Sequence, residues 1–419
     1  MDTVRRIDWR RNWFIFALIL GAILLPVSGP IDRGVLRLLR PISIFALFFG
    51  IVGVLTLLGA IYLGPIAERS RRNLRLLQAF GALLIFIAFL VAPAYADNIP
   101  YVTTYKLTVA LQWVMVVVGI NLLTGYTGQI SLGQGAYFAI GGYLLAIASF
   151  REWSLPWGVS LILAPIFTGI LGFLFGFPAL RFKGPYLALA TLALAVVISP
   201  VAKRFEDFTG GVQGIPMYGQ INTWGIFGDD YERFLYYFSL VAAAAMLLIV
   251  WNIMHSRLGR ALIAIRDNEV AAAAMGVNTA LYKTTAFGIA AAFAGFAGAI
   301  NAATIQFVSP DQYSVLVSIR VFVGAVIGGV ASVLGAVVGG LFTQLIPDIA
   351  AGISDAAPDA IQAVILVVFM YAMRGGFAGF VEQTWRYGRQ GVQLLRPERA
   401  AEEREGRAAA PVTSSQEQA

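Results

Sequence analysis

Long apolar runs separated by short polar stretches are the main feature of this chain. The runs at 107–150, 157–180, 184–202, 284–310 and 321–347 contain no Asp, Glu, Lys or Arg. A helix of about 20 apolar residues can cross the hydrocarbon core of a bilayer. The pattern therefore predicts an all-α polytopic membrane protein with roughly 10 to 11 transmembrane or half-membrane helices. We expect them at 13–29, 42–63, 76–95, 106–124, 132–150, 157–177, 184–202, 234–254, 284–306, as a broken pair within 315–346, and at 359–374.

Composition supports a membrane protein rather than a large soluble one. Of the 419 residues, 58% are hydrophobic and 13% are charged, whereas a soluble domain carries about 25% charged residues. So few polar residues could not coat the core of a soluble protein of this composition. The chain has no cysteine, which excludes disulfides, thiolate nucleophiles and thiol metal ligands.

The net charge of +7 raises the question of an acidic partner. The arginines gather at the ends of the predicted spans, not along one face, which indicates membrane lipids with anionic headgroups rather than nucleic acid. A cytoplasmic N-terminus satisfies the positive-inside rule best. Arg33, Arg37 and Arg40 then fall outside, against the rule. The basic residues placed inside are Arg69, Arg71, Arg72, Arg75, Arg181, Lys183, Arg257, Arg260, Arg266 and Lys283.

The two ends of the chain differ from its middle. After Arg5, Arg6, Arg10 and Arg11, the first apolar stretch lacks an A-x-A cleavage pattern, so we expect a retained anchor rather than a signal peptide. Beyond about 376 hydrophobicity is lost, which predicts a mostly disordered cytoplasmic tail. The predicted organisation is an N-terminal basic segment with accessory helices (1–105), a membrane core (106–375) and the tail (376–419).

The segment 315–346 is expected to form a hairpin. With both termini in the cytoplasm, the preceding span 284–306 delivers the chain to the outer side, and the acidic turn around Asp348, Asp355 and Asp359 is also outside. The segment must therefore enter and leave by the same side, as two short helices that turn near Gly328 and Gly329.

Two segments, 125–142 and 323–340, are unusually rich in glycine. Glycine in a membrane helix either permits close helix packing or marks non-helical backbone. Packing is the favoured interpretation for 323–340. In 125–142 polar side chains are interleaved with the glycines, and irregular backbone at membrane depth is tolerated where protein buries it or it lines a wet cavity. This favours lining of a substrate pathway over packing glycines. The pathway candidates are Gly125, Gly128, Gln129, Ser131, Gly133, Gln134 and Gly135.

Glycines also mark a predicted external loop before 234–254. Its residues Thr209, Gly210, Gly211 and Gly214 are expected in a turn-rich loop at the outer mouth.

The chain lacks the residues for several kinds of chemistry. Tyr282 stands before Lys283, where a phosphate-binding P-loop needs glycine, so we expect no nucleotide site. The sole histidine, His255, stands at a span edge without an acidic pair or cysteine, so we expect no metal site. No carboxylate falls near the middle of a predicted span, which counts against proton coupling.

A polar segment from 256 to 283 interrupts the apolar pattern. Asp267 is a suitable helix N-cap, and Gly276 a suitable C-terminal stop, so we expect a short cytoplasmic helix between them. Its small face, Ala271 to Ala274, suits close docking into a protein groove, whereas an interfacial membrane helix carries bulky apolar anchors. The polar rim consists of Arg260, Arg266, Asp267 and Glu269.

This segment resembles a known transporter motif. Glu269, Ala271, Ala272 and Gly276 resemble the EAA loop of ATP-binding-cassette (ABC) importer permeases. The sequence "GRALIAIRDNEVAAAAMGVN" is similar to the corresponding sequences of the branched-chain amino acid permease family of LivM type. "NLLTGYTGQISLGQGAYFAIGGY", "RFKGPYLALATLA", "TGGVQGI" and "VIGGVASVLGAVVG" agree in the same order over about 120–375. Many members carry histidine where Gln134 stands, and Arg320 has no assigned counterpart.

The resemblance implies an importer permease in the bacterial inner membrane. It implies pairing with a second homologous permease, two ATPases that bind ATP and dock on the 256–283 coupling loop, and a periplasmic substrate-binding protein. This chain would hold no cofactor and perform no covalent chemistry. The alternatives are a urea or short-amide permease of the same family, a standalone secondary carrier, and a membrane-embedded enzyme. The last is disfavoured because intramembrane carboxylates, histidine and cysteine are lacking.

Overall fold

The computed structural model describes residues 86–87, 89–93, 103–151, 154–179, 181–182, 184–217, 230–351 and 375–384. The predicted spans 13–29, 42–63 and 359–374, the tail beyond 384, the acidic residues Asp355 and Asp359, and Lys183 lie outside the described residues, as does most of the predicted span 76–95. The chain divides into two units, Leu84–Ala378 and a second one formed by Met1–Leu83 with Gly379–Ala419. The fold below is that of the first unit.

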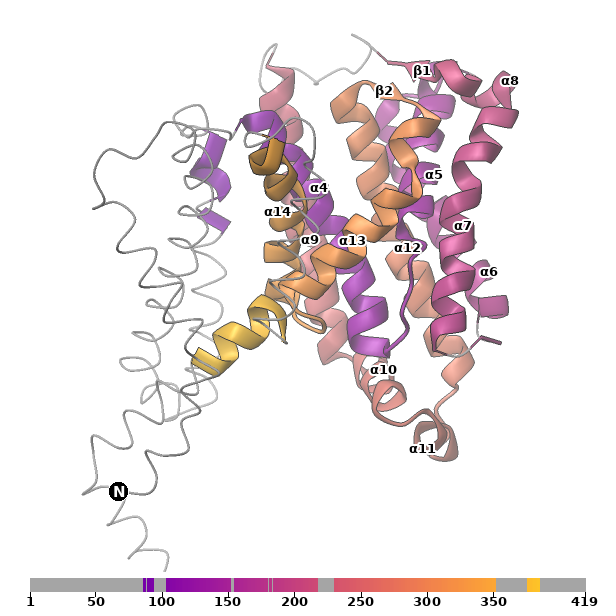
Figure 1. Ribbon diagram of the computed structural model, residues 1–419, viewed down its shortest axis with the longest axis vertical. Helices are drawn as coiled ribbons and strands as arrows, with labels where there is room; N and C mark the ends of the chain where they lie inside the picture. The colour runs from indigo at the N-terminus through magenta and orange to yellow at the C-terminus, as the bar shows by residue number, and fades with distance from the viewer. Residues whose placement is uncertain are drawn as a thin grey trace, which may run out of the picture. The chain divides into compact units, whose positions relative to one another are not determined.

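The first unit is built almost entirely of helices (Figure 1). In chain order its described elements are α4 (Thr104–Ile120), the π-helix η2 (Asn121–Tyr126), α5 (Gln134–Ala146), the π-helix η3 (Ile147–Arg151), α6 (Trp157–Ala179), α7 (Pro185–Arg204), α8 (Glu206–Thr209), the 3-10 turn η4 (Gly211–Gln213), β1 (Ile215–Pro216), α9 (Tyr231–His255), α10 (Arg257–Asp267), α11 (Glu269–Ala274), α12 (Thr279–Ile305), β2 (Phe307–Val308), the 3-10 turn η5 (Pro310–Tyr313), α13 (Val315–Gly328) and α14 (Val333–Ala351).

The predicted fold class is confirmed: the chain is an all-α polytopic membrane protein. In the described part, the helices long and apolar enough to cross a membrane are α4 with η2, α6, α7, α9 and α12, and α13 and α14 are shorter apolar helices. These agree within a few residues with the predicted spans at 106–124, 157–177, 184–202, 234–254 and 284–306.

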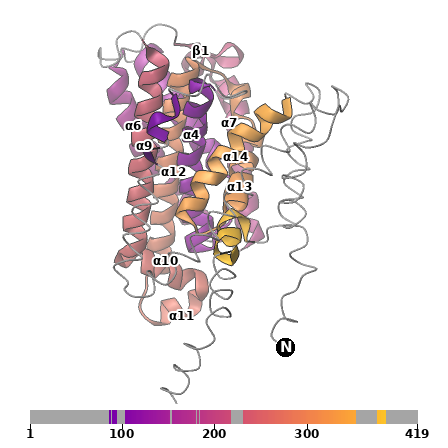
Figure 2. The same cartoon turned by 90° about the vertical axis from the view of Figure 1, so that its left-hand side faces the viewer.

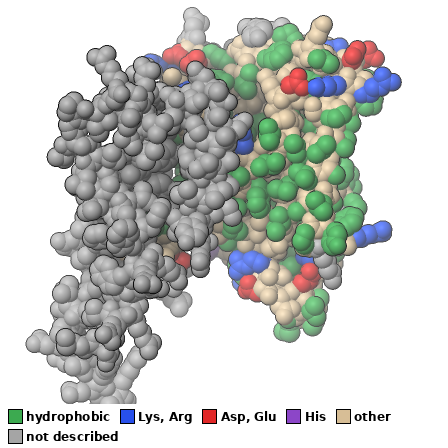
Figure 3. Space-filling model, viewed as in Figure 1, with side chains coloured by type: hydrophobic (Ala, Val, Ile, Leu, Met, Phe, Trp, Pro, Cys, Tyr) green, Lys and Arg blue, Asp and Glu red, His purple; other side chains and the backbone are tan. Residues whose placement is uncertain are grey.

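The long helices run between two polar ends (Figures 1 and 2). One end, which we call the ribbon end, carries α8 and the antiparallel pair β1–β2, in which Ile215 lies opposite Val308. The other, which we call the loop end, carries α10 and α11. Charged side chains gather mostly at these two ends, and hydrophobic side chains cover the band between them (Figure 3). An apolar band between two polar ends is the arrangement expected of a protein that crosses a bilayer between two aqueous faces.

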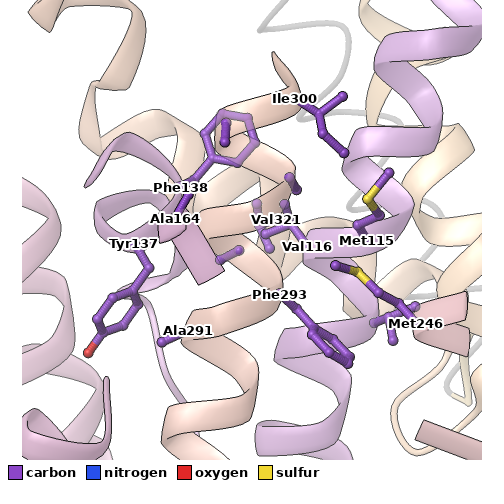
Figure 4. Close-up of a cluster of buried hydrophobic side chains, with 14 of the residues drawn as sticks. Met115, Val116, Tyr137, Phe138, Ala164, Met246, Ala291, Phe293, Ile300 and Val321 are labelled. Atoms are coloured by element: carbon purple, nitrogen blue, oxygen red, sulfur yellow. The ribbon is translucent and has the colours of Figure 1, made fainter. Parts of the chain in front are cut away.

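α4 and α12 form the centre of the unit. In the most apolar 18-residue stretch of α4 with η2, 89% of the residues are buried. In the corresponding stretch of α7, which has nearly the same mean hydropathy, only 22% are buried. Met115 of α4, Phe293 of α12 and Met246 of α9 belong to the buried hydrophobic cluster between these helices (Figure 4). α7 therefore presents most of its surface outward.

Glycines bring α5 and α12 into close contact. A Cβ added to Gly141 would overlap the carbonyl of Gly295, and one added to Gly298 would overlap the carbonyl of Phe138. Without a strong hydrophobic driving force between helices in lipid, such close backbone approach supplies much of the packing attraction. α12 thus serves as the surface on which α5 lies.

The predicted span 132–150 agrees within two residues with α5 and η3, which together are helical from Gln134 to Arg151. Regular structure stops after η2, residues 128–133 are not helical, and α5 begins only at Gln134. The predicted break in the first glycine-rich segment is therefore present, and it lies between Gly128 and Gly133.

The predicted hairpin in 315–346 is confirmed, with its turn at residues 329–332 between α13 and α14. Its glycines act in packing, as favoured from the sequence. Gly328 approaches the carbonyl of Gly335, and Gly324 approaches that of Gly339. Gly329 begins the turn with φ of +105°, a conformation that L side chains rarely adopt.

Candidate functional site

The non-helical segment 128–133 leads from the loop end toward the middle of the bundle (Figure 1). It begins at Gly128, whose φ is +72°. Gln129 and Ser131 are buried, whereas Ile130 between them is 41% exposed. The Gln129 N–H donates to the Leu123 carbonyl at 3.2 Å. Buried polar atoms of this segment therefore have only part of the pairing that a helix would give them.

Two hydroxyls from other helices hold the start of α5. The Leu132 N–H donates to Oγ1 of Thr191, on α7, at 2.9 Å. The Gly135 N–H donates to Oγ of Ser318, on α13, at 2.9 Å. A Cβ at Gly135 would overlap Ser318, and one at Gly133 would lie 3.1 Å from the Thr191 carbonyl oxygen. Neither hydroxyl was expected from the sequence, although Thr191 is an isolated polar residue in the charge-free run 184–202.

Gln134 is the most unusual of the predicted pathway residues. Its side chain is fully buried, and neither amide atom has a hydrogen-bond partner in the described part of the chain. The Oε1 atom of Gln129 is also buried without a hydrogen-bond partner in the described part of the chain. A buried polar group left unpaired costs about 1–3 kcal/mol, so each one calls for a functional or conformational explanation.

Two tyrosines extend this set toward the ribbon end. The hydroxyls of Tyr143 on α5 and Tyr313 on η5 are buried without a partner in the described part of the chain, and their ring centroids lie 5.8 Å apart. Burial raises the pKa of the Tyr313 phenol, so the group is a neutral hydrogen-bond donor at physiological pH. Phe138 packs edge-on against Tyr313.

The described cavity lies elsewhere. It has a volume of about 250 Å³ and lies at the ribbon end, between α4, α9 and α12. The predicted pathway residues do not line it, and their role in a pathway stays a prediction. The cavity is lined by Tyr105, Thr108, Tyr231, Glu232, Leu235, Thr304, Ile305 and Gln306.

In the described part of the chain, no cluster of His, Asp and Glu could hold a metal ion.

Asn121 joins the first glycine-rich segment to the hairpin turn. Its Oδ1 accepts from the Ala331 N–H at 2.7 Å, and its Nδ2 donates to the Ser332 carbonyl at 2.7 Å. Ala331 has φ of +66°, unusual for a residue with a side chain. Gly125 packs directly against this turn, since a Cβ there would overlap the Ala331 nitrogen. The two glycine-rich segments of the sequence therefore meet at the loop end.

A buried amide cluster ties α4 to α12. Nδ2 of Asn301 donates to Oε1 of Gln112 at 2.7 Å, and Nε2 of Gln112 donates to Oγ1 of Thr304 at 2.6 Å. These side chains satisfy one another, in contrast to Gln134. They are part of the packing of the centre.

The polar segment 256–283 contains two helices, α10 and α11, where one was expected. The N-cap prediction of Asp267 was wrong: Asp267 ends α10, and Asn268 caps α11 by accepting from the Ala271 N–H at 3.0 Å. The C-terminal prediction is confirmed. Gly276 has φ of +84°. Its N–H donates to the Ala273 carbonyl, and the Val277 N–H donates to the Ala272 carbonyl. These two hydrogen bonds form a Schellman motif.

The outer surface of α11 differs from the all-alanine face predicted from the sequence. Ala272 is buried against the rest of the loop, whereas Ala271, Ala273 and Ala274 are exposed. Two bulky apolar side chains, Val270 at 80% and Met275 at 85% exposure, flank them. α11 therefore presents bulky apolar side chains as well as small ones, and the expectation that it lacks the bulky anchors of an interfacial membrane helix was wrong.

The rim residues of the loop have distinct contacts. Arg260 donates to the His255 carbonyl at 3.2 Å, within the turn between α9 and α10. Glu269 forms an ion pair with Lys283 at 2.5 Å, which links α11 to α12. Arg266 pairs with Asp267 at 3.1 Å and also reaches the Gly125 carbonyl.

The predicted outer loop is an ordered turn at the ribbon end. Oγ1 of Thr209 donates to the Phe205 carbonyl at 2.7 Å and accepts from the Gly211 N–H at 3.3 Å. Gly210, Gly211 and Gly214 all have positive φ, and β1 follows at once. Lys203 and Asp311, 2.7 Å apart, join α7 to η5 beside this turn.

Comparison with known proteins agrees with this architecture. Residues 102–373, more than half of the chain, match the family described as "Branched-chain amino acid transport system / permease component". No solved structure matches the chain.

Curated relatives are similar over part of their length. The high-affinity branched-chain amino acid transport system permease protein LivM of Salmonella typhimurium is 32% identical over 54% of this chain and 58% of its own. LivM of Escherichia coli is 31% identical over 59% of this chain and 64% of its own. LivH of E. coli, from a transport system of the same name, is 24% identical over 65% of this chain and 92% of its own. The chain thus spans less than two thirds of the LivM proteins, and it belongs to the permease family of branched-chain amino acid transport systems.

Proposed function

We propose that this chain is the membrane-spanning permease subunit of an ABC importer that moves branched-chain or related amino acids across the bacterial inner membrane. The observation that carries the proposal is the match of residues 102–373 to this permease family, together with the α10–α11 loop that projects at one end of the bundle. Family membership and the names of the relatives support the substrate class.

The same proposal assigns the two ends of the bundle to the two sides of the membrane. Arg257, Arg260 and Arg266 lie on α10, so the positive-inside rule favours a cytoplasmic loop end. The ribbon end then faces the periplasm, where the substrate-binding protein delivers its ligand. Both chain termini are cytoplasmic in this arrangement.

Energy comes from outside this chain. Two separate ATPase subunits bind and hydrolyse ATP, and a second homologous permease completes the membrane part, as the presence of both LivM and LivH in one named type of system suggests. Val270 and Met275 are suited to an apolar groove on an ATPase subunit, because burying such side chains stabilises a complex by about 1.5–3 kcal/mol each. The chain itself binds no cofactor and makes no covalent intermediate.

Transport then consists of alternation between outward-open and inward-open arrangements. The buried but unpaired amide of Gln134 supports this interpretation, since a group without partners in one arrangement can gain them in another or from a passing substrate. The pathway candidates Gly125, Gly128, Gln129, Ser131, Gly133, Gln134 and Gly135 would line the route. Amides, hydroxyls and a helix N-terminus suit a small zwitterion with an aliphatic side chain.

A urea or short-amide permease of the same family is the main alternative. Amide and hydroxyl groups along the route would also bind urea. A standalone secondary carrier is the second alternative, but such a carrier has no need of an apolar-tipped docking loop.

The test is reconstitution in vesicles with ATP inside, together with the second permease, the ATPases and the binding protein. We expect uptake of leucine, isoleucine or valine that requires ATP and all subunits. Titration of the binding protein with these amino acids and with urea distinguishes the two substrate classes. Accumulation of solute by the isolated chain, driven by an ion gradient alone, would refute the importer assignment.

A further inference from the structure

One side chain connects the cytoplasmic loop to the glycine-broken segment. Arg266 lies in the last turn of α10. Its Nε and Nη2 donate to Oδ1 of Asp267 at 3.1 Å, while Nη1 donates to the carbonyl of Gly125, 141 positions away in the sequence, at 3.3 Å. The guanidinium is therefore held by the loop at one edge and by η2 at the other.

The aliphatic part of Arg266 makes a second contact with the same segment. Its Cγ lies 3.1 Å from the position where a Cβ of Gly128 would stand. Gly128 is the residue where helical structure ends and the non-helical segment begins. Arg266 thus contacts both η2 and the first residue of the non-helical segment.

Gly125 also contacts the hairpin turn. The same glycine that accepts from Arg266 leaves room for Ala331 to pack against its backbone. Asn121, one turn earlier, accepts a hydrogen bond from the Ala331 N–H and donates one to the Ser332 carbonyl. A displacement of α10 that moves Arg266 must therefore shift η2 and the α13–α14 turn together, or break these hydrogen bonds.

We propose that Arg266 is a positioning residue that transmits movement of the α10–α11 loop to the non-helical segment 128–133 and to the hairpin turn. This inference rests on the proposed function, because the movement originates in the ATPase subunits. The planar guanidinium suits the task, since it donates in several fixed directions at once, whereas a lysine ammonium is a single flexible point charge.

The experiment uses the natural lack of cysteine in this chain. Ile130→Cys introduces a single thiol at the exposed position in the broken segment. In the complete importer in vesicles, reaction of this thiol with a soluble maleimide is measured without nucleotide and with a non-hydrolysable ATP analogue. Uptake and ATP hydrolysis are measured on the same preparations.

With Arg266 in place, we expect the labelling rate to differ between the two nucleotide states. In Arg266→Gln, we expect this difference to vanish and the uptake per ATP hydrolysed to fall by about five- to 150-fold, the range of typical coupling between two sites. Arg266→Lys keeps the charge and serves as the second variant. It is expected to lose the difference as well, because one ammonium does not span Asp267 and Gly125.

Arg181→Gln is the control, since Arg181 is an exposed arginine that lies outside the 256–283 coupling loop. It should keep both the labelling difference and the uptake ratio. The proposal is overturned if either Arg266 variant, assembled with its ATPase subunits, keeps the natural uptake ratio or the labelling difference. Absence of ATP-driven uptake with the unaltered chain would instead refute the proposed function.

Discussion

Replacing Gly276 by valine is expected to loosen α11 without a steric clash. In the described part of the chain, no atom other than those of Gly276 and its two chain neighbours lies within 4 Å of the place where a Cβ of Gly276 would stand. The obstacle is the backbone: φ is +84°, where L residues are strained and β-branched residues most of all. The substitution thus tests conformation separately from contact.

The magnitude follows from this geometry. The left-handed conformation costs an L residue about 1–2 kcal/mol relative to glycine. α11 has only six residues, and helices this short are unstable alone, so its two caps hold it together. A loss of 1–2 kcal/mol raises the open fraction of the C-terminal cap by about 5- to 30-fold.

Hydrogen exchange at the Val277 amide measures this directly, because that amide bonds the Ala272 carbonyl at 3.1 Å only when the cap is formed. We expect exchange to accelerate by the same factor in Gly276→Val. Gly276→Asn is the control, since asparagine tolerates the left-handed region, and it should change exchange little. Unchanged exchange in Gly276→Val, or equal acceleration in both variants, would refute the reasoning.

Two further substitutions test contacts in the bundle and the loop. Glu269→Lys places a second cation beside Lys283 and should lower uptake by up to about fivefold, because the side chain of Glu269 is 45% exposed and such pairs contribute only about 0.2–1 kcal/mol. The double change Glu269→Lys with Lys283→Glu should restore uptake, and a double variant as impaired as the single one would contradict a role for this ion pair. Gly141→Leu should lower the thermal midpoint of the purified protein, since overpacking costs about 1–3 kcal/mol and the added side chain would overlap Gly295. Gly379→Leu is its matched control, with open space around the Cβ in the described part of the chain, and equal effects of the two leucines would count against close α5–α12 packing.

Local features of the sequence predicted most of the described helices. Charge-free apolar runs gave the long spans, because hydrophobicity over about 20 residues alone decides whether a helix suits the bilayer. Gly276 predicted the end of α11, since few other residues adopt its backbone conformation. The hairpin near Gly328 and Gly329 followed from counting the crossings. The N-cap was misplaced by one residue because both Asp267 and its neighbour Asn268 are good caps.

The candidate site was foreseen only as a set of residues. Glycines interleaved with polar side chains marked 125–142 as irregular. Nothing in the local pattern showed that Gln134 would be buried without partners while Gln112 would be paired with Asn301. Both are glutamines in the charge-free run 107–150, and their difference depends on which helices lie beside them. The hydroxyls of Thr191 and Ser318, which accept from N–H groups at the start of α5, were missed for the same reason.

By itself, the sequence determined that this protein is a helical membrane protein with a polar, capped loop, because hydropathy and capping act over a few consecutive residues. Tertiary structure decided which helix occupies the centre. α4 and α7 have mean hydropathies of 1.9 and 2.0, yet are 89% and 22% buried. It also decided that Arg266 meets Gly125 across 141 positions. Such choices depend on the packing of helices far apart in the chain, where small residues allow backbones to approach, and a local pattern does not contain that information.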